Sequence, residues 1–325
     1  MTKVAIIGAG QLGSRHLQAL ASLKDSADIF ISDPSHASLD MARERFQQVM
    51  PGNHLNVVFC TEIPANENKF DVAIVATNAD VRRHVIEQLL TICKVRYLVL
   101  EKVLFQKIDD YEAVGKLLRE KGVSAWVNCP RRMWPSYNWL KAKIASQKIL
   151  CVLVHGSNWG LGCNSIHMID LVAFLSGKTE YTISSQRLSP GSIPAKRQGF
   201  EEFSGCLDGV FADGPIFSLF SSPVGDVPTI IEVVTETSRF IIKEHEQKTW
   251  YAEESGNWIW QEFDFVVPYQ SSLTNLLVEE LTAVGCCRLP GYDESAALHV
   301  PLIQALQSHL EQKDPARRGK SCPIT

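Results

Sequence analysis

Short apolar runs alternate with helix-like segments along the first part of the chain. The runs are rich in β-branched residues, as is typical of buried strands, and they occupy residues 4–7, 29–32, 57–60, 72–76, 97–100 and 124–128. Helices are predicted between them over residues 14–20, 35–49, 80–93 and 109–121. This alternation predicts an α/β domain with a doubly wound parallel sheet.

From residue 150 the pattern becomes mainly strand-like. Candidate strands cover residues 150–156, 181–188, 217–221, 229–235, 239–243, 248–252 and 258–261. Helices are predicted at residues 164–175, 271–286 and 294–312. Runs of strands after a βαβ domain indicate a second, α+β domain with a mainly antiparallel sheet. We therefore expect two domains, residues 1–126 and residues 127–325.

Composition excludes several classes of protein. The 325 residues carry a net charge of -4 and no long basic block, so we expect neither nucleic acid nor a membrane surface as a partner. No apolar run approaches the ~20 residues of a transmembrane helix, and the first strand leaves no room for a signal peptide. The nine cysteines include no C-x-x-C pair, which favours reduced thiols, a cytoplasmic location and no metal site.

A glycine-rich turn joins the first strand to the first helix. Its members are Gly8, Ala9, Gly10, Gln11, Leu12 and Gly13. In a G-x-G-x-x-G motif the first glycine permits the tight turn, the second lets the backbone approach a pyrophosphate, and the third allows close packing. The helix N-terminus adds free N–H groups for phosphates. The motif predicts a Rossmann dinucleotide-binding domain; a glycine-rich turn of another α/β fold is the alternative.

A carboxylate follows the second strand. Asp33 lies twenty residues after Gly13, where it would accept hydrogen bonds from the adenosine ribose. Its neighbours Ser32, Pro34 and Ser35 offer no cation to hold a 2′-phosphate. We therefore expect NAD rather than NADP as the cofactor.

Polar residues also follow three later strands, namely Thr77, Asn78, Glu101, Lys102 and Asn128. Ligands of doubly wound sheets bind at the carboxyl ends of the strands, so these residues should line one crevice with the glycine loop. A lysine there could handle the proton of a hydride transfer. The alternative is a solvated lysine paired with Glu101.

The glycine motif, Thr77 and residues 100–102 together resemble the glucose–fructose oxidoreductase / inositol dehydrogenase / MocA (Gfo/Idh/MocA) family, whose hallmark is Glu-Lys-Pro at this strand end. The resemblance continues through residues 128–134 and 162–171. It implies an open-faced antiparallel sheet in the second domain, with substrate contacts and a dimer surface. It also implies that Lys102 contacts the nicotinamide and the substrate.

The same resemblance points to His167 as the general acid/base, because the family carries a histidine near the start of the second domain's first helix. Asn164, His167 and Asp170 are three residues apart, so they share one helical face. Histidine also exchanges protons readily near pH 7. A core histidine hydrogen-bonded to Asp170 is the alternative.

Two positions depart from the family pattern. Val103 stands where the family has proline, and cis peptide bonds are rare before other residues, so we expect a different turn there. Cys163 stands four residues before the histidine, where the family often has aspartate. Asn164 beside it can orient a hydroxyl but cannot carry a proton. Proton handling would then rest on Lys102 and His167.

Other polar residues have weaker assignments. Arg131 and Arg132 follow Asn128 and could meet a substrate carboxylate or phosphate, although surface charge explains them equally well. His16 and His84 are assigned structural roles.

We interpret the chain as an NAD(P)-dependent oxidoreductase that moves a hydride between nicotinamide and a secondary alcohol or ketone. The resemblance implies that the small-molecule substrate is a sugar, amino sugar, cyclitol or nucleotide sugar. A glycosidase that retains its NAD and a non-catalytic NAD-binding sensor are the alternatives. Net turnover of free NAD separates the dehydrogenase from both.

An open sheet face exposes more apolar surface than a monomer usually tolerates. We therefore expect a homodimer or homotetramer. Candidates for the uncovered face are Ile230, Val233, Phe240 and Ile242.

Overall fold

A computed structural model describes residues 1–49, 52 and 54–325 and divides the chain into two compact units. Unit 1 comprises Met1–Phe105, Asp109–Pro130 and Pro268–Asp293; unit 2 comprises Gln106–Ile108, Arg131–Val267 and Glu294–Thr325. The expected division into residues 1–126 and 127–325 is wrong in one main respect, because residues 268–293 return to unit 1. Local patterns do not show such a return, since they do not record which unit a helix packs against.

Unit 1 is built on a six-stranded parallel sheet with the order β3-β2-β1-β4-β5-β6. Its strands are β1 (Thr2–Ile7), β2 (Ala27–Ser32), β3 (Leu55–Cys60), β4 (Lys69–Val75), β5 (Lys94–Leu100) and β6 (Ser124–Val127). Ile6, Ile29 and Ile74 have no exposed surface, as continuous apolar runs require in strands covered on both faces. The predicted doubly wound α/β fold is confirmed.

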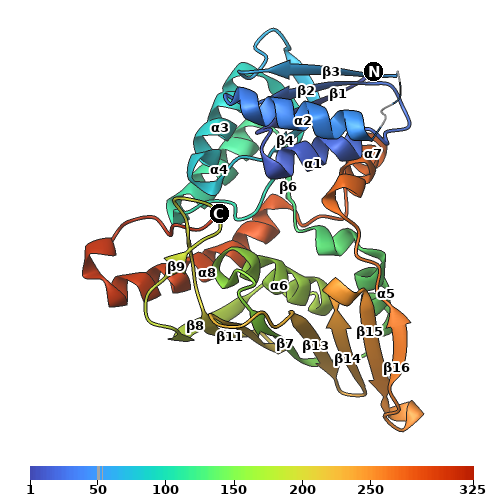
Figure 1. Ribbon diagram of the computed structural model, residues 1–325, viewed down its shortest axis with the longest axis vertical. Helices are drawn as coiled ribbons and strands as arrows, with labels where there is room; N and C mark the ends of the chain where they lie inside the picture. The colour runs from blue at the N-terminus through green and yellow to red at the C-terminus, as the bar shows by residue number, and fades with distance from the viewer. Residues whose placement is uncertain (50–51, 53) are drawn as a thin grey trace. The chain divides into compact units, whose positions relative to one another are not determined.

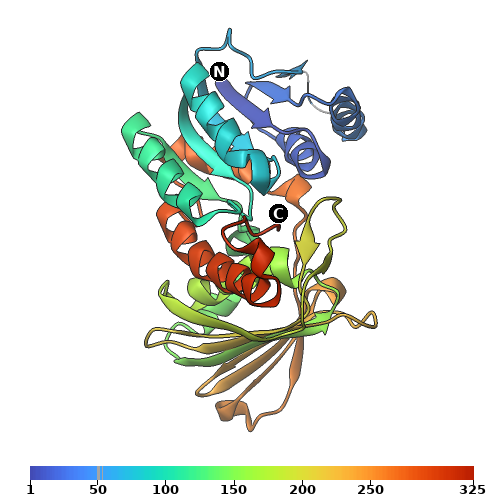
Figure 2. The same ribbon diagram turned by 90° about the vertical axis from the view of Figure 1, so that its left-hand side faces the viewer.

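Helices cover both faces of this sheet. Figures 1 and 2 show α1 (Gln11–Leu20), α2 (His36–Gln48) and α7 (Thr274–Val284) on one face, and α3 (Ala79–Ile92) and α4 (Ile108–Lys121) on the other. Strand β1 pairs with both β2 and β4, so the strand order reverses there. The carboxyl ends of strands beside such a switch point are where α/β sheets bind ligands.

Unit 2 is organised around an eight-stranded sheet with the order β16-β15-β14-β13-β7-β12-β11-β8. Its strands are β7 (Ile149–Ser157), β8 (Tyr181–Leu188), β11 (Gly205–Phe211), β12 (Ile216–Ser222), β13 (Ile230–Thr235), β14 (Ser238–Lys243), β15 (Lys248–Glu253) and β16 (Gln261–Asp264). Only β7 and β12 pair in parallel among these neighbours. A separate pair is formed by β9 (Ile193–Pro194) and β10 (Glu201–Glu202). The mainly antiparallel sheet is as predicted.

Some elements of unit 2 differ from the apolar pattern. Strand β16 begins at Gln261 rather than residue 258, because Asn257 and Trp258 adopt positive φ after a short 3-10 turn. Strand β11 was not predicted, since Asp208 and Gly209 break its apolar character. Helix α5 (Pro135–Lys143) was also not predicted.

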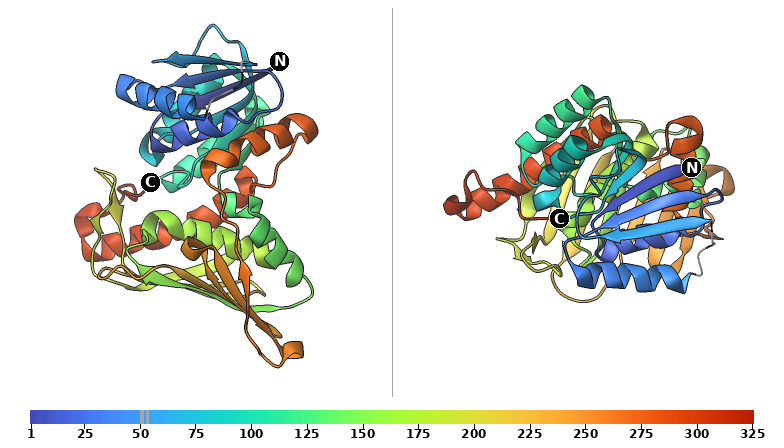
Figure 3. Two further views of the ribbon diagram at one scale, coloured as in Figure 1. Left: turned by 45° about the vertical axis from the view of Figure 1, so that its right-hand side comes forward. Right: turned by 90° about the horizontal axis from the view of Figure 1, so that it is seen from above.

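Helices α5, α6 (Leu161–Ser176) and α8 (Tyr292–Lys313) lie on one face of the unit 2 sheet (Figures 1 and 3). No helix of the described chain covers its other face. None of the described helices combines the length and the apolar composition needed to cross a bilayer.

Of the four residues expected on the uncovered face, only Ile230 lies there, half-buried and one position before the buried Ile231. Val233, Phe240 and Ile242 are at most 1% exposed, and the Phe240 ring meets Trp139 of α5, so they belong to the covered face. Successive residues of β13 and β14 point to opposite faces, so the residues between these buried ones point to the uncovered face. The uncovered face carries Val210, Ile216 and Phe220, which are 44%, 55% and 44% exposed.

Candidate functional site

The glycine loop between β1 and α1 is too tightly packed for a side chain at two of its three motif glycines. Gly8 has a φ of +100°, and a Cβ there would lie 3.0 Å from the carbonyl carbon of Ala76. A Cβ on Gly13 would lie 1.8 Å from the Gly8 carbonyl oxygen. The Cβ position of Gly10 has nothing within 4 Å. Space for a phosphate group is therefore left open at the N-terminus of α1.

Asp33, directly after β2, turns toward this loop. Its Oδ2 accepts a hydrogen bond from the Ala9 amide at 2.8 Å, and its Oδ1 accepts one from the Ser35 amide at 2.8 Å. Each carboxylate oxygen has a further lone pair, so Asp33 can still accept hydrogen bonds from ribose hydroxyls. In the first turn of α1, the Gln11 side chain accepts a 2.6 Å hydrogen bond from Arg45, and Leu12 is half-buried.

Thr77 and Asn78 follow β4 at the same edge of the sheet. The Thr77 hydroxyl oxygen is buried, while its carbonyl oxygen accepts a hydrogen bond from Arg82. That Thr77 contacts the cofactor stays a prediction. Asn78 is the N-cap residue of α3.

Glu101, at the end of β5, belongs to a closed ring of polar side chains, all of them buried except the half-buried Gln270. Glu101 Oε1 lies 2.8 Å from His16 Nε2 and accepts a 2.6 Å hydrogen bond from Asn128. Asn128 also donates to Gln270 Oε1 at 3.0 Å. His16 Nδ1 lies 2.8 Å from Thr274 Oγ1, to which Gln270 donates at 3.1 Å.

This ring occupies the side chains of two predicted site residues. Glu101 and Asn128 are each 3% exposed, because their polar atoms face each other inside unit 1. That Glu101 contacts the cofactor and Asn128 the substrate stays a prediction. Gln270 comes from a segment 142 residues beyond Asn128, so no local pattern could reveal the ring. His16 was assigned a structural role, and in the structure it joins Glu101 to Thr274 within this ring.

Glu101 remains charged inside the ring. Burial alone would raise the pKa of its carboxyl. The hydrogen bonds from His16 and Asn128 and the charge of buried Arg82 outweigh that effect and hold the pKa of Glu101 below its usual range. Unit 1 therefore keeps a buried negative charge next to Lys102.

Lys102 itself is half-buried. The peptide bond from Lys102 to Val103 is cis. The expectation of a different turn at Val103 is therefore wrong, because this chain adopts the cis bond without proline.

In unit 2, two predicted site residues, Asn164 and His167, lie near the start of α6. The helix begins after Gly160, which has a φ of +78°. Cys163, Asn164 and His167 are half-buried in its first two turns. The Asn164 amide nitrogen donates a 2.6 Å hydrogen bond to the Trp159 carbonyl, which orients that side chain at the helix end.

The N-terminus of α6 also holds the Glu202 carboxylate of β10. Glu202 Oε2 accepts a 2.6 Å hydrogen bond from the Gly162 amide, and Oε1 accepts one from the Cys163 amide at 3.2 Å. The partial positive charge of a helix N-terminus stabilises such an anion. The sequence analysis missed Glu202, because it lies forty residues away from Gly162 along the chain and on a two-residue strand.

Arg131 is engaged by a partner inside unit 2. Its Nε and Nη2 donate to the two carboxylate oxygens of Glu244 at 2.7 and 2.6 Å. The Tyr137 hydroxyl donates to the same carboxylate at 2.6 Å. A bidentate pair of this kind satisfies both charges. That Arg131 binds a substrate anion stays a prediction, and such an anion would have to compete with Glu244.

Arg132 joins α6 to α8 within unit 2. Its guanidinium donates to both Asp170 oxygens at 2.8 to 3.1 Å and to Glu294 at 2.7 Å. Burial raises the pKa of the Asp170 carboxyl to about 6, and the charge of Arg132 opposes that rise. Asp170, which is 1% exposed, thus has an arginine as its main partner.

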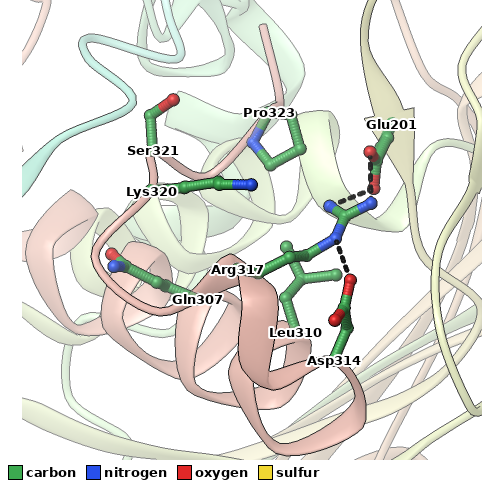
Figure 4. A pocket seen from close by; sticks show the side chains of 8 residues that line it. All are labelled: Glu201, Gln307, Leu310, Asp314, Arg317, Lys320, Ser321 and Pro323. Carbon is green, nitrogen blue, oxygen red and sulfur yellow. Dashed lines mark hydrogen bonds and ion pairs between the residues drawn. The ribbon is translucent and has the colours of Figure 1, made fainter.

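A cavity of about 400 Å³ lies elsewhere in unit 2, beside the end of α8 (Figure 4). Arg317 on its wall donates two 2.8 Å hydrogen bonds to the Glu201 carboxylate, and Asp314 lies 3.7 Å from the same guanidinium. These charges are paired with one another. None of the described lining residues is a predicted site residue, so the cavity is separate from the candidate site.

Comparison with known proteins agrees with the geometry of unit 1. The family model described as "Oxidoreductase family, NAD-binding Rossmann fold" matches residues 2–129. No curated protein matches the chain.

Solved structures share the fold along almost the whole chain. UDP-N-acetylglucosamine 3-dehydrogenase from Acidithiobacillus ferrooxidans has a TM-score of 0.71 at 12% identity, covering 96% of this chain and 98% of that one. An oxidoreductase from Agrobacterium radiobacter, solved with NAD+, L-tartaric acid and magnesium, has a TM-score of 0.71 at 16% identity, covering 96% and 97%. The transcriptional regulator Gal80p from Kluyveromyces lactis has a TM-score of 0.69 at 15% identity, covering 96% and 90%. The shared fold therefore serves enzymes and a regulator.

The buried Arg132–Asp170 pair predicts a pH-dependent loss of stability in Arg132→Met. Because the folded-state pKa of Asp170 is raised, its contribution to stability is complete at low pH and falls as the pH rises toward about 6. Removing Arg132 raises that pKa further and leaves a buried carboxylate without its partner at higher pH. We expect the free energy of unfolding to fall by about 3–5 kcal/mol at pH 8 and by less at pH 5, measured by urea denaturation.

The double variant Arg132→Met with Asp170→Asn is the control. It removes the ionisable group and should remove most of the difference between the two pH values. An equal loss of stability at pH 5 and pH 8 in Arg132→Met would contradict the pairing.

Proposed function

Because residues 2–129 belong to the Gfo/Idh/MocA oxidoreductase family, we propose that the chain is an NAD-dependent dehydrogenase or reductase acting on a secondary alcohol or ketone. The glycine loop carries the proposal. Gly8 and Gly13 pack too closely to be replaced, while the space at Gly10 is open for a pyrophosphate at the N-terminus of α1. Asp33 beside that loop suits the hydroxyls of an adenosine ribose.

The proposed substrate is a sugar, amino sugar, cyclitol or nucleotide sugar. The family resemblance supports this class. So does the likeness in fold to a UDP-N-acetylglucosamine 3-dehydrogenase, which is named for a nucleotide sugar. A UDP-linked amino sugar is therefore the first compound to test, followed by free hexoses, amino sugars and cyclitols.

We assign proton transfer and stabilisation of the developing charge to His167 and Lys102. In the oxidising direction, His167 takes the hydroxyl proton and Lys102 stabilises the charge that develops on that oxygen. NAD supplies the hydride acceptor when bound. Asn164, which is oriented by the Trp159 carbonyl, positions a substrate hydroxyl but cannot relay a proton.

Replacement of His167 tests the proposed function directly. General base catalysis contributes about 10²–10⁴-fold, so His167→Asn should lower kcat on that scale and leave NAD affinity nearly unchanged. Lys102→Met should lower kcat and also weaken NAD binding, because Lys102 is proposed to touch the nicotinamide. Asn164→Ala should mainly raise KM. The measurements are steady-state NADH formation and titration calorimetry with NAD.

The matched control for this series is His84→Asn, which changes an exposed histidine on α3. It should alter neither kcat nor NAD affinity. Near-normal turnover in His167→Asn would show that the histidine is structural and would remove it from the site.

Asp33 predicts a preference for NAD over NADP. Its carboxylate can accept hydrogen bonds from both ribose hydroxyls, whereas a 2′-phosphate would meet a like charge. Calorimetry should show tighter binding of NADH than NADPH, and Asp33→Ala should narrow that difference. The control is Asp40→Ala, which removes an exposed carboxylate of α2 paired with Arg43. It should leave the difference in affinity between NADH and NADPH unchanged. Tighter binding of NADPH by the unmodified chain would overturn the assignment.

A non-catalytic NAD-binding sensor is the second candidate. Cys163, in place of the aspartate frequent in the family, favours it, and Gal80p shows that a transcriptional regulator can have this fold. The same substrate panel separates the two candidates. NAD binding without net NADH formation, and without hydrolysis of glycosides by protein-bound NAD, would favour the sensor over the dehydrogenase.

We also propose that the uncovered face of the unit 2 sheet pairs with a second copy of the chain. Val210 and Ile216 lie opposite each other on β11 and β12, and Phe220 is exposed further along β12. An apolar patch of this kind is uncommon on a monomer. Pairing through this face gives a homodimer, alone or as half of a homotetramer.

Ile216→Glu places a charge in the centre of this patch and should dissociate the assembly. Light scattering should then give a mass near the 36.2 kDa of one chain, against a multiple of it for the unmodified protein. Val224→Glu, which changes a residue 73% exposed outside the sheet, should leave the mass unchanged. A single-chain mass for the unmodified protein at micromolar concentration would contradict the proposal.

A further inference from the structure

The chain is held by hydrogen bonds to buried charged groups on both sides of Lys102. Before it stands Glu101, a carboxylate whose hydrogen-bond partners are buried inside unit 1. After it, the carbonyl oxygens of Val103 and Leu104 both accept hydrogen bonds from Nη1 of Arg82. The only half-buried group of this stretch is Lys102, since residues 101 and 103 to 106 are buried.

Arg82 lies on α3 and is 1% exposed. Its Nη1 donates to Leu104 at 2.9 Å as well as to Val103, and its Nη2 donates to the Thr77 carbonyl. One guanidinium therefore joins the loop after β5 to the end of β4. Strand β4 is the direct neighbour of β1, which leads into the glycine loop, and β5 is the next strand beyond β4.

Burying a guanidinium is costly unless its N–H groups are satisfied. An apolar side chain on α3 would fill the same space at a lower desolvation cost. It could not donate hydrogen bonds to three carbonyl oxygens of two separate loops. The charge of Arg82 also acts on Glu101, where it helps to hold the pKa of that carboxyl low. The loop of Lys102 is thus held by hydrogen bonds after the lysine and by a paired carboxylate before it.

We propose that Arg82 is a positioning residue of the reaction, which acts by holding the loop that carries Lys102. His16, through Glu101, is the second support of the same loop. The inference rests on the proposed function for Lys102. A catalytic group has to be held within a fraction of an ångström, and a misplacement of about 1 Å can cost about 10²-fold in rate.

The test is a double-mutant cycle in the full chain. Arg82→Met should lower kcat about 10²-fold with little change in KM, and Arg82→Lys, which keeps the charge and can donate to fewer carbonyls, should recover part of that loss. In a Lys102→Met background, Arg82→Met should cause almost no further loss, because its effect passes through Lys102. His16→Gln should behave in the same non-additive way.

Arg83→Met is the matched control, because Arg83 is the next residue of the same helix and pairs with Glu87 and Asp110 at the surface. It should leave kcat unchanged. An unchanged kcat in Arg82→Met would overturn the proposal. So would an equal loss in the Lys102→Met background, which would indicate general damage to unit 1.

Hydrogen exchange followed by mass spectrometry gives a readout that needs no turnover. Arg82→Met should speed exchange in residues 101–106 and leave the peptides of β1 and β2 unchanged, while Arg82→Lys should show a smaller change. If no compound in the panel is turned over, the proposed function fails, and exchange still decides whether Arg82 holds the loop. Unchanged exchange at residues 101–106 would overturn the inference.

Discussion

The buried carboxylate of Glu101 is the constraint on which the carboxyl edge of unit 1 depends. A charge this deeply buried is stable only where hydrogen bonds and opposite charge replace water. His16 of α1 and Asn128 after β6 supply those bonds directly, and Gln270 and Thr274 complete the ring. A segment from the far end of the chain therefore bonds the two side chains that satisfy the charge at the end of β5. These bonds are among the contacts that join residues 268–293 to unit 1.

The arginines that follow Asn128 are likewise paired with carboxylates inside unit 2. Arg131 is paired with Glu244, and Arg132 is paired with Asp170 and Glu294. Arg131 was a candidate substrate-binding residue because of its residue type, but its hydrogen-bond partner Glu244 lies inside unit 2. The same holds for Asn128 in unit 1. Other candidate residues are half-buried, among them Asp33, Thr77 and Lys102 in unit 1 and Asn164 and His167 in unit 2.

The features that could be predicted from the sequence are those that depend on neighbouring residues. The strands of unit 1 follow from continuous apolar runs, because both faces of a parallel sheet are covered. The tight turn at Gly8 and Gly13 follows from the spacing of the glycines. The ring around Glu101, the Glu202 carboxylate at α6 and the exposed side of the unit 2 sheet were not predicted. Each depends on which distant segment lies opposite, and periodicity carries no such information.

The absence of an aspartate at position 163 does not by itself remove negative charge from the start of α6. The Glu202 carboxylate lies there instead, with Oε1 3.2 Å from the Cys163 amide nitrogen. It is bonded to the backbone rather than carried by the helix, so its position is set by β10 and by the free amides of the first turn. Cys163 is therefore weaker evidence against catalysis than the family's sequence pattern suggests. The residue at position 163 alone therefore does not decide between the dehydrogenase and the sensor.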